Sequence, residues 1–407
     1  MNTKLIKREE YLKKLRDLKD EHIIKVISGV RRSGKSSLLA LFKRELLRAG
    51  VAHQQIQSIN FEEAKNINLS DWLSLHRHLE KNLVPHKMNY IFLDELQLVD
   101  NFEKMIDSLF VKPNVDLYVT GSNAYFLSGE WATLLSGRYM EIKMLPFSFA
   151  EYVEMLGDDR RQDEAKFFDF LRNGGFPQSV EIFKKNISLG IDYLTGVFNT
   201  VAIKDILTRK GANDPDALEN VLKFVFDNIS KPLSPKKIAD YMASNYRSMS
   251  SRTIEAFLTA AKESFVLYDV DRFNIKGKEL LQTQQKYYLV DTGLRQVLLA
   301  RDQQFDTGRA LENVVYLELL RRGYQVWTGK TKSGKEVDFV AKTNTGIIEY
   351  YQVTETMRGE TTRERELSAL QNIDDNNTKI VLSLDPEWNN YDGIQQKNVI
   401  SWLLDKR

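Results

Sequence analysis

The sequence predicts an α/β fold whose first part is a parallel sheet covered by helices. Apolar runs typical of buried strands alternate with helical stretches from residue 23 to about 145. Strands that alternate with helices favour parallel pairing, because each helix returns the chain to the same end of the sheet. A glycine-bounded loop, GVRRSGKSS at 29–37, stands directly after the first apolar run. The alternation predicts the sheet, and the loop indicates a ligand at the sheet's carboxyl edge.

The composition is typical of a globular chain with several domains. Its 407 residues exceed one ordinary core, and 42% of them are hydrophobic while 28% are charged. A net charge of +2 means that any basic surface must be local, and the absence of cysteine excludes disulfides and thiolate metal sites. No apolar run reaches the roughly 18 residues of a membrane span, and the charged start does not resemble a signal peptide. We therefore expect a cytoplasmic protein with no membrane partner.

The elements of the first part follow from local pattern. Residues 1–21 are charged and amphipathic, which predicts a helix before the first strand at 23–28. After the loop, apolar residues at three- and four-residue spacing predict a helix that stops at Gly50. Further strands are expected within 54–63, 89–97, 115–123 and 138–148.

The pattern changes after residue 148. A helical stretch with a break at NGGFP (173–177) is followed by two short serine-capped helices and two strands around a basic turn. That second group is typical of a winged helix-turn-helix. From about residue 300, a helix and three strands begin another α/β segment. The predicted domains are an α/β core with the glycine-bounded loop at 1–150, a helical connector at 151–228, a winged helix-turn-helix at 229–298 and a C-terminal α/β domain at 299–407.

The loop after the first strand has the pattern of a phosphate-binding P-loop. Its glycines, lysine and serine fit G-x-x-x-x-G-K-[ST]. The backbone N–H groups and the following helix's positive end suit phosphate, the lysine suits the β- and γ-phosphates, and the serine hydroxyl suits Mg²⁺. The sequence therefore predicts ATP or ADP with Mg²⁺, held by Gly29, Arg32, Ser33, Gly34, Lys35, Ser36 and Ser37.

Polar residues that end the later strands complete this prediction. We expect Asp94 to hold Mg²⁺ together with Ser36, and Glu95 to polarise the attacking water. Ser122 and Asn123 end the next strand and are predicted to contact the γ-phosphate and that water, while Asn60 is a candidate to hold Glu95 in an unreactive pose. The alternative is that these small polar residues only terminate strands.

Arg138 follows a glycine near the far side of the predicted core. Phosphoryl transfer gains from a cation that reaches the transition state from a neighbouring subunit. We predict that role for Arg138, and with it homo-oligomers that depend on nucleotide. The alternative is a surface or structural arginine.

Several motifs occur in order and carry a family resemblance: SGVRRSGKSSLL, INFEE, FLDELQLVDNFEKMIDSLF, VTGSNAYFLSGE, LSGRYMEIKMLPFSFAEY and NGGFPQ. Together they resemble the bacterial and archaeal AAA-type ATPases known only as ATP-binding proteins. YYLVDTGLR and LENVVYLELLRRGYQVWTGKTKSGKEVDFVA are similar to the C-terminal domain of unknown function that accompanies them. The resemblance covers nearly the whole chain. It implies an AAA+ (P-loop) core, a winged helix and a restriction-endonuclease-like, PD-(D/E)XK-type fold.

Nucleases of that type hold a metal with carboxylates and place a lysine near the attacking water. The resemblance assigns Glu312 and Asp338 to the first two acidic positions, Gln352 to the third and Thr354 to the lysine position. Threonine supplies no positive charge, so we predict a degenerate module that does not cleave. Glu349 or Glu355 would restore an acid only if the strand register slipped.

The winged helix predicts a DNA partner. Hydroxyl and basic side chains near the start of its second helix and in its basic turn suit phosphate contact, and the alternative is a protein-binding winged helix. The residues are Ser251, Arg252 and Thr253 in the helix and Arg272, Lys276 and Lys278 in the turn.

The predicted function is an ATP-hydrolysing molecular switch or motor that acts on DNA. Two alternatives remain open at this point. One is a nucleotide-gated protein-interaction module with little turnover, and the other is an ATP-dependent nuclease.

Overall fold

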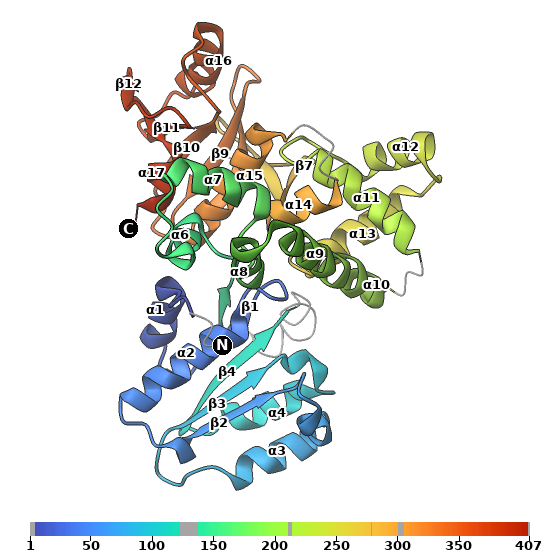
Figure 1. Cartoon of the computed structure of the whole chain (residues 1–407), viewed down its shortest axis with the longest axis vertical. Helices are drawn as coiled ribbons and strands as arrows, with labels where there is room; N and C mark the ends of the chain where they lie inside the picture. Colours follow the sequence, from blue (N-terminus) through green and yellow to red (C-terminus); the bar gives the residue numbers. More distant parts are fainter. Residues whose placement is uncertain (1–4, 123–136, 211–213, 278, 300–304, 406–407) are drawn as a thin grey trace. The chain divides into compact units, whose positions relative to one another are not determined.

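The computed structural model describes residues 5–122, 137–210, 214–277, 279–299 and 305–405. The chain forms two compact units (Figure 1). The first comprises Met1–Pro146 with Glu263–Phe265, and the second comprises Phe147–Lys262 with Val266–Arg407. In the described part of the chain, every helix is too short or too polar to cross a membrane.

The first unit contains the predicted parallel sheet. Its strands run in the order β2-β3-β4-β1-β5, and every neighbouring pair is parallel. The strands β1, β3 and β4 are buried along their whole length, as their apolar runs predict. Their bounds are β1 Ile24–Ser28, β2 Ile56–Asn60, β3 Asn89–Asp94, β4 Val115–Gly121 and β5 Tyr139–Lys143.

Helices cover both faces of this sheet. Helices α1 (Glu9–Asp17) and α2 (Lys35–Arg48) bury their apolar stripes in one core cluster, around Phe42. Helices α3 (Trp72–Lys81) and α4 (Phe102–Phe110) fill the cluster on the opposite face. The predicted two-sided α/β arrangement is therefore confirmed. Short 3₁₀ turns lie at His53–Gln55, Ala64–Leu69 and Leu96–Leu98.

The second unit begins with a series of helices. The predicted break at 173–177 separates α7 from α8, and Gly174 there has φ 72°, in the left-handed region that favours glycine. A π-helical turn, Asn199–Lys204, connects α9 to α10. The helices are α6 Phe149–Leu156, α7 Asp163–Asn173, α8 Pro177–Lys185, α9 Ile187–Phe198, α10 Asp205–Lys210, α11 Pro215–Asp227, α12 Pro235–Asn245, α13 Ser251–Glu263 and α14 Thr292–Leu298.

One mixed sheet of eight strands forms the rest of this unit, in the order β12-β13-β11-β10-β9-β8-β6-β7. Helices α15 (Thr307–Arg321), α16 (Glu360–Gln371) and α17 (Val399–Leu404) accompany it. The strands are β6 Leu267–Asn274, β7 Glu279–Leu289, β8 Gln325–Lys330, β9 Glu336–Lys342, β10 Ile348–Val353, β11 Thr378–Ser383, β12 Asn389–Tyr391 and β13 Ile394–Asn398.

The predicted hairpin does not stand alone. Strand β6 pairs with β7 on one side and with β8 on the other, so the sheet continues across the expected border near residue 298. Arg272, expected in the exposed turn, lies inside β6 opposite Thr328 and is only partly exposed. The last two predicted segments therefore share one sheet. The division into four domains stays a prediction.

Candidate functional site

Polar residues gather at the carboxyl edge of the first sheet. The register pairs Asn60 with Asp94 across β2 and β3, and Ser28 with Gly121 across β1 and β4. Because β4 lies between β1 and β3, Thr120 at its end stands between the glycine-rich loop and the acidic turn. This edge is where parallel α/β sheets bind their ligands.

The loop from Gly29 to Gly34 has the backbone of a phosphate cradle. Gly29 has φ 147°, and a Cβ there would lie 2.1 Å from the carbonyl oxygen of Met144, so only glycine fits. Gly34 has φ 103° and is the N-cap of α2, where no side chain caps the helix. The first-turn N–H groups of a helix of 14 residues are thus left to a ligand. Arg32, also in the loop, has φ 67°.

Three serines of the predicted set line the same loop and helix start. Ser36 and Ser37 are exposed in the first turn of α2. Ser33 is fully buried, and its hydroxyl has no hydrogen-bond partner among the described residues. Hydroxyls beside an uncapped helix start fit a triphosphate and its Mg²⁺.

Lys35 is buried at the centre of the site. Its Nζ lies 3.0 Å from the carbonyl oxygen of Gly29, 3.3 Å from that of Val30 and 3.6 Å from Oε1 of Glu95. Burial lowers the pKa of Lys35, and the nearby carboxylates oppose that shift. A phosphate group would add the negative charge that favours the ammonium form.

Asp94 receives two hydrogen bonds at the strand end. The Thr120 hydroxyl donates to Oδ1 at 2.6 Å, and the Asn60 amide donates to Oδ2 at 3.0 Å. Such bonds fix the orientation of the Asp94 carboxylate, as a ligand of Mg²⁺ would require. The expected contact from Asn60 to Glu95 is replaced by this one, because Asn60 and Asp94 are register partners.

Glu95 is held by two other donors. Gln97 Nε2 lies 2.5 Å and Ser122 Oγ 3.0 Å from Oε2 of Glu95, and the Glu95 N–H donates to the Thr120 hydroxyl at 2.8 Å. Burial raises the pKa of Glu95, but Lys35 and these hydrogen bonds outweigh burial and lower it overall. Glu95 also has φ 56°, a conformation uncommon for a non-glycine residue and frequent at functional sites. Ser122 therefore lies beside Glu95, and its contact with the γ-phosphate stays a prediction. Gln97 is a residue that the sequence did not reveal.

Arg8 is a second residue that sequence patterns missed. Its guanidinium is buried and donates to the carbonyl oxygens of Ser33, at 3.1 Å, and Leu145, at 2.9 Å. It thereby ties the glycine-rich loop to the segment that follows β5. In the loop itself, Arg31 forms an ion pair with Glu62 at 2.7 Å.

Arg138 lies at the opposite edge of the same sheet. Tyr139 pairs with Ile24 at the amino end of β1, while the loop leaves β1 after Ser28. The strand rises by about 3.3 Å per residue over the four residues from Ile24 to Ser28. Arg138 is therefore remote from its own chain's phosphate loop. Its guanidinium forms an ion pair with Asp107. Asn123, the other predicted catalytic residue of this region, lies outside the described residues.

The predicted nuclease-like residues come together in the second unit. Glu312 of α15 and Asp338 of β9 share one neighbour, the ammonium group of Lys286 on β7, at 3.2 Å and 4.0 Å. Lys286 also contacts Glu336 at 2.5 Å. Burial alone would lower the pKa of Lys286, but the three carboxylates raise it overall. Sequence patterns did not indicate Lys286 at this position, because Lys286 comes from β7 of the hairpin rather than from β10.

The other two positions of the predicted motif lie in β10 and directly after it. Gln352 accepts a hydrogen bond from the Asp338 N–H at 3.3 Å, and Thr354 is buried at the predicted lysine position. Glu349 accepts hydrogen bonds from the hydroxyls of Tyr324 and Tyr351, at 2.7 and 2.6 Å. Strand β10 pairs regularly with β9 and β11, so no slip brings another acid into the cluster.

Apart from Arg272, the predicted DNA-contact residues are exposed where the structure describes them. Ser251, Arg252 and Thr253 are exposed at the start of α13, and Lys276 is exposed in the turn between β6 and β7. Lys278 lies outside the described residues. These positions are available to a partner, and their chemistry suits phosphate.

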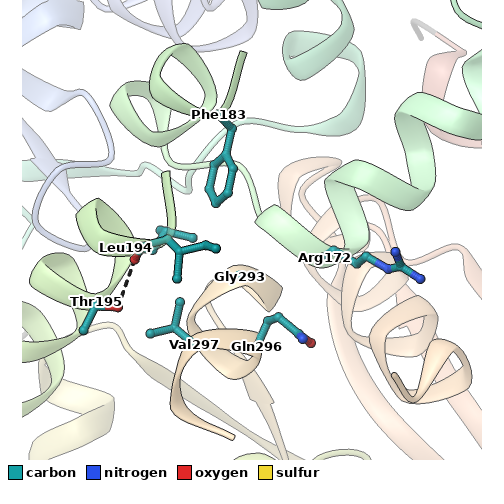
Figure 2. Close-up of a pocket in the computed structure, with 8 residues that line it drawn as sticks. Arg172, Phe183, Leu194, Thr195, Gly293, Gln296 and Val297 are labelled. Carbon is teal, nitrogen blue, oxygen red and sulfur yellow. Dashed lines mark hydrogen bonds between the residues drawn. The ribbon is translucent and has the colours of Figure 1, made fainter. Parts of the chain in front are cut away.

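A small cavity of about 130 Å³ lies among four helices of the second unit. Figure 2 shows Phe183, Leu194 and Val297 directed into it from α8, α9 and α14. Its lining is mainly apolar, with Arg172 at its rim from α7. The cavity lacks the convergent polar groups of the site in the first unit, and we interpret it as a packing defect between helices.

Comparisons with known proteins agree with the fold of the first unit. Residues 21–153 match the AAA domain family, and residues 164–304 match a domain of unknown function, DUF8612. An uncharacterized protein of Haemophilus influenzae is 37% identical over 411 residues, which are 99% of this chain and 100% of the relative. The uncharacterized protein MJ1544 of Methanocaldococcus jannaschii is 29% identical over 384 residues, which are 88% of this chain and 81% of that protein.

A solved structure shares the fold. The walker-type ATPase PABY2304 of Pyrococcus abyssi superposes with a TM-score of 0.53 at 15% identity, over 73% of this chain and 96% of that one. This match agrees with the motif series, the parallel five-stranded core and the full-length relative. The chain therefore belongs to the family of AAA-type, P-loop ATP-binding proteins in which a domain of unknown function follows the AAA domain.

Proposed function

We propose that this protein hydrolyses ATP and uses the cycle as a molecular switch or motor on DNA. The observation that carries the proposal is the joined set of Lys35, Glu95, Thr120 and Asp94 at one sheet edge. Phosphoryl transfer needs a lysine at the phosphates and a residue that orients the attacking water, and Lys35 and Glu95 lie 3.6 Å apart at the same sheet edge.

Each residue has a chemical role in this proposal. Ser36 and Asp94 would hold Mg²⁺, which when bound supplies positive charge against the phosphate oxygens. Lys35 neutralises the β- and γ-phosphates, and the α2 N–H groups bind them. Glu95 orients the attacking water and accepts its proton, once Gln97 and Ser122 no longer occupy Oε2.

The decisive measurement is the ATPase rate of the full chain with single-stranded, double-stranded and branched DNA. Glu95→Gln keeps the shape of the side chain and removes its basicity, so ATP binding should persist while the rate falls by roughly 10²–10⁴. Lys35→Ala should lose nucleotide binding as well. Little turnover by the unmodified protein under every condition would favour a nucleotide-gated protein-interaction module instead.

DNA contact has its own test. Exposed Arg252 and Lys276 should each neutralise about one phosphate, so each alanine variant should lower the slope of log affinity against log salt by about 1. Arg160→Ala, another exposed arginine, is the matched control. A DNA affinity that is absent, or that does not depend on salt, would contradict the DNA part of the proposal and leave the ATPase part standing.

A further inference from the structure

The acidic cluster of the second unit already contains a cation. Nζ of Lys286 lies 3.2 Å from Oε1 of Glu312, 2.5 Å from Oε1 of Glu336 and 4.0 Å from Oδ1 of Asp338. The Lys286 side chain is 3% exposed. An ammonium group that has left water must be compensated by such partners, and here it has three.

The oxygens that a metal would need are engaged with the protein. Oε1 of Glu312 also accepts a hydrogen bond from the Tyr288 hydroxyl at 2.6 Å. Oδ2 of Asp338 accepts one from the Val353 N–H at 2.9 Å. Among the described residues, no group of three acidic or histidine side chains is arranged as a metal site, and here the carboxylates surround Lys286 instead.

The third ligand position is engaged in the same way. The Gln352 carbonyl oxygen accepts from the Asp338 N–H, and its amide nitrogen donates to Glu366 at 2.7 Å. Arg365 in turn donates to the other oxygen of Glu366, at 2.6 Å. The one acceptor oxygen of the Gln352 side chain is therefore already engaged, and its amide nitrogen cannot bind a cation.

We propose that Lys286 replaces the divalent metal of this nuclease-like site, so that its ammonium group is the permanent counter-ion of Glu312, Glu336 and Asp338. The site then binds no Mg²⁺ and cleaves no phosphodiester. Its role is to fasten β7 to α15 and β9, the elements that carry these residues. The reason is electrostatic, since a divalent ion beside the buried ammonium would be repelled at close range.

The test is a titration of the nucleotide-free full chain with Mn²⁺. The electron paramagnetic resonance signal of the free ion measures how much Mn²⁺ is bound. Wild type and Asp338→Asn should take up the same amount of Mn²⁺ through the millimolar range. Lys286→Met should bind one further ion per chain, because three carboxylates lose their counter-ion. That ion should disappear in Lys286→Met/Asp338→Asn, and Mn²⁺ should raise the melting temperature of Lys286→Met only.

Two outcomes would overturn the proposal. One is Mn²⁺ uptake by the wild type that Asp338→Asn or Glu312→Gln abolishes. The other is a folded Lys286→Met chain that gains no ion. If Lys286→Met does not fold, the wild-type comparison still decides the matter. None of these readouts depends on ATP hydrolysis.

Discussion

At the scale of single residues, the nucleotide site is a network in which one hydroxyl joins two acids. The Thr120 side chain accepts from the Glu95 backbone and donates to Asp94. Gln97 and Ser122 then occupy one oxygen of Glu95. A carboxylate so engaged is a poorer base, because hydrogen bonds to the charged form lower its pKa.

Gln97→Leu tests whether this engagement restrains catalysis. A hydrogen bond to a charged group contributes about 1.5–3 kcal/mol, so its loss should raise the basal ATPase rate by roughly tenfold and reduce any stimulation by DNA. Gln57→Leu, a similar change away from the site, should leave the rate unchanged. A rate that falls in Gln97→Leu would mean that Gln97 positions Glu95 productively.

A buried ion pair lies inside the core of the same unit. Nζ of Lys25 is 2.5 Å from Oδ1 of Asp116, and their side chains are 0% and 1% exposed. Lys25→Met removes one partner and leaves the other charge buried, which should lower the free energy of unfolding by about 3–5 kcal/mol in urea titrations.

The exposed pair of Lys112 and Glu80, 2.8 Å apart, provides the control. Lys112→Met should cost less than about 1 kcal/mol, since solvent already screens that pair. Replacing both buried partners, as in Lys25→Met/Asp116→Leu, should be less destabilising than Lys25→Met alone. Equal effects of Lys25→Met and Lys112→Met would contradict this account.

At the scale of elements, the order of strands decides which loops meet. Strand β4 lies between β1 and β3, so Thr120 and Ser122 come between the phosphate loop and the acidic turn. In the second unit, the loop between α7 and α8 is fixed to the start of α14. Asp291, the N-cap of α14, accepts from the Gly175 N–H at 2.6 Å and from the Gly293 N–H at 2.9 Å.

This junction predicts a pH dependence. Burial raises the pKa of Asp291 from 3.8 to about 7, although the backbone N–H groups oppose the shift. Between these values the folded chain holds a proton that the unfolded chain has released. The stability of the wild type should therefore fall, relative to Asp291→Asn, as the pH rises from about 4 to about 7.

Unfolding free energies of the two chains across this pH range are the measurement. The Asn variant also loses an acceptor for a backbone N–H, which is a cost that does not vary with pH. Asp192→Asn, at an exposed position of α9, should follow the wild type throughout. Parallel pH profiles of the wild type and Asp291→Asn would show that Asp291 does not titrate in this window.

At the scale of the whole molecule, the position of Arg138 leads to a prediction about homo-oligomers. It stands at the amino edge of the sheet, whereas its own chain's phosphate loop is at the carboxyl edge. An arginine in this place reaches a nucleotide only if that nucleotide belongs to another copy. We therefore expect ATP-dependent homo-oligomers with sites shared between subunits.

Mixing two inactive variants tests this expectation. Arg138→Ala keeps its own phosphate loop, and Lys35→Ala keeps its arginine, so the mixture should regain ATPase activity that neither variant has alone. Mass measurements with and without ATP would report assembly. Full activity of Arg138→Ala by itself would contradict a catalytic role in either arrangement.

Local sequence pattern was sufficient to predict much of the fold of this protein and part of its candidate site. The parallel core, the loop from Gly29 to Ser36 and the acidic turn at Asp94 follow from apolar periodicity and glycine placement, which depend on neighbouring residues alone. Strand β10 also keeps a regular register with β9, and the Gln352 side chain meets the Asp338 N–H.

Contacts between distant segments were decided only by tertiary structure. Gln97 reaches Glu95 because a 3₁₀ turn folds it back, and Lys286 reaches Glu312 because β7 and α15 pack together. The hairpin of β6 and β7 joins the last sheet through an edge that no local pattern specifies. Sequence periodicity fixes which face of an element is buried, but it carries no information about which other element covers that face.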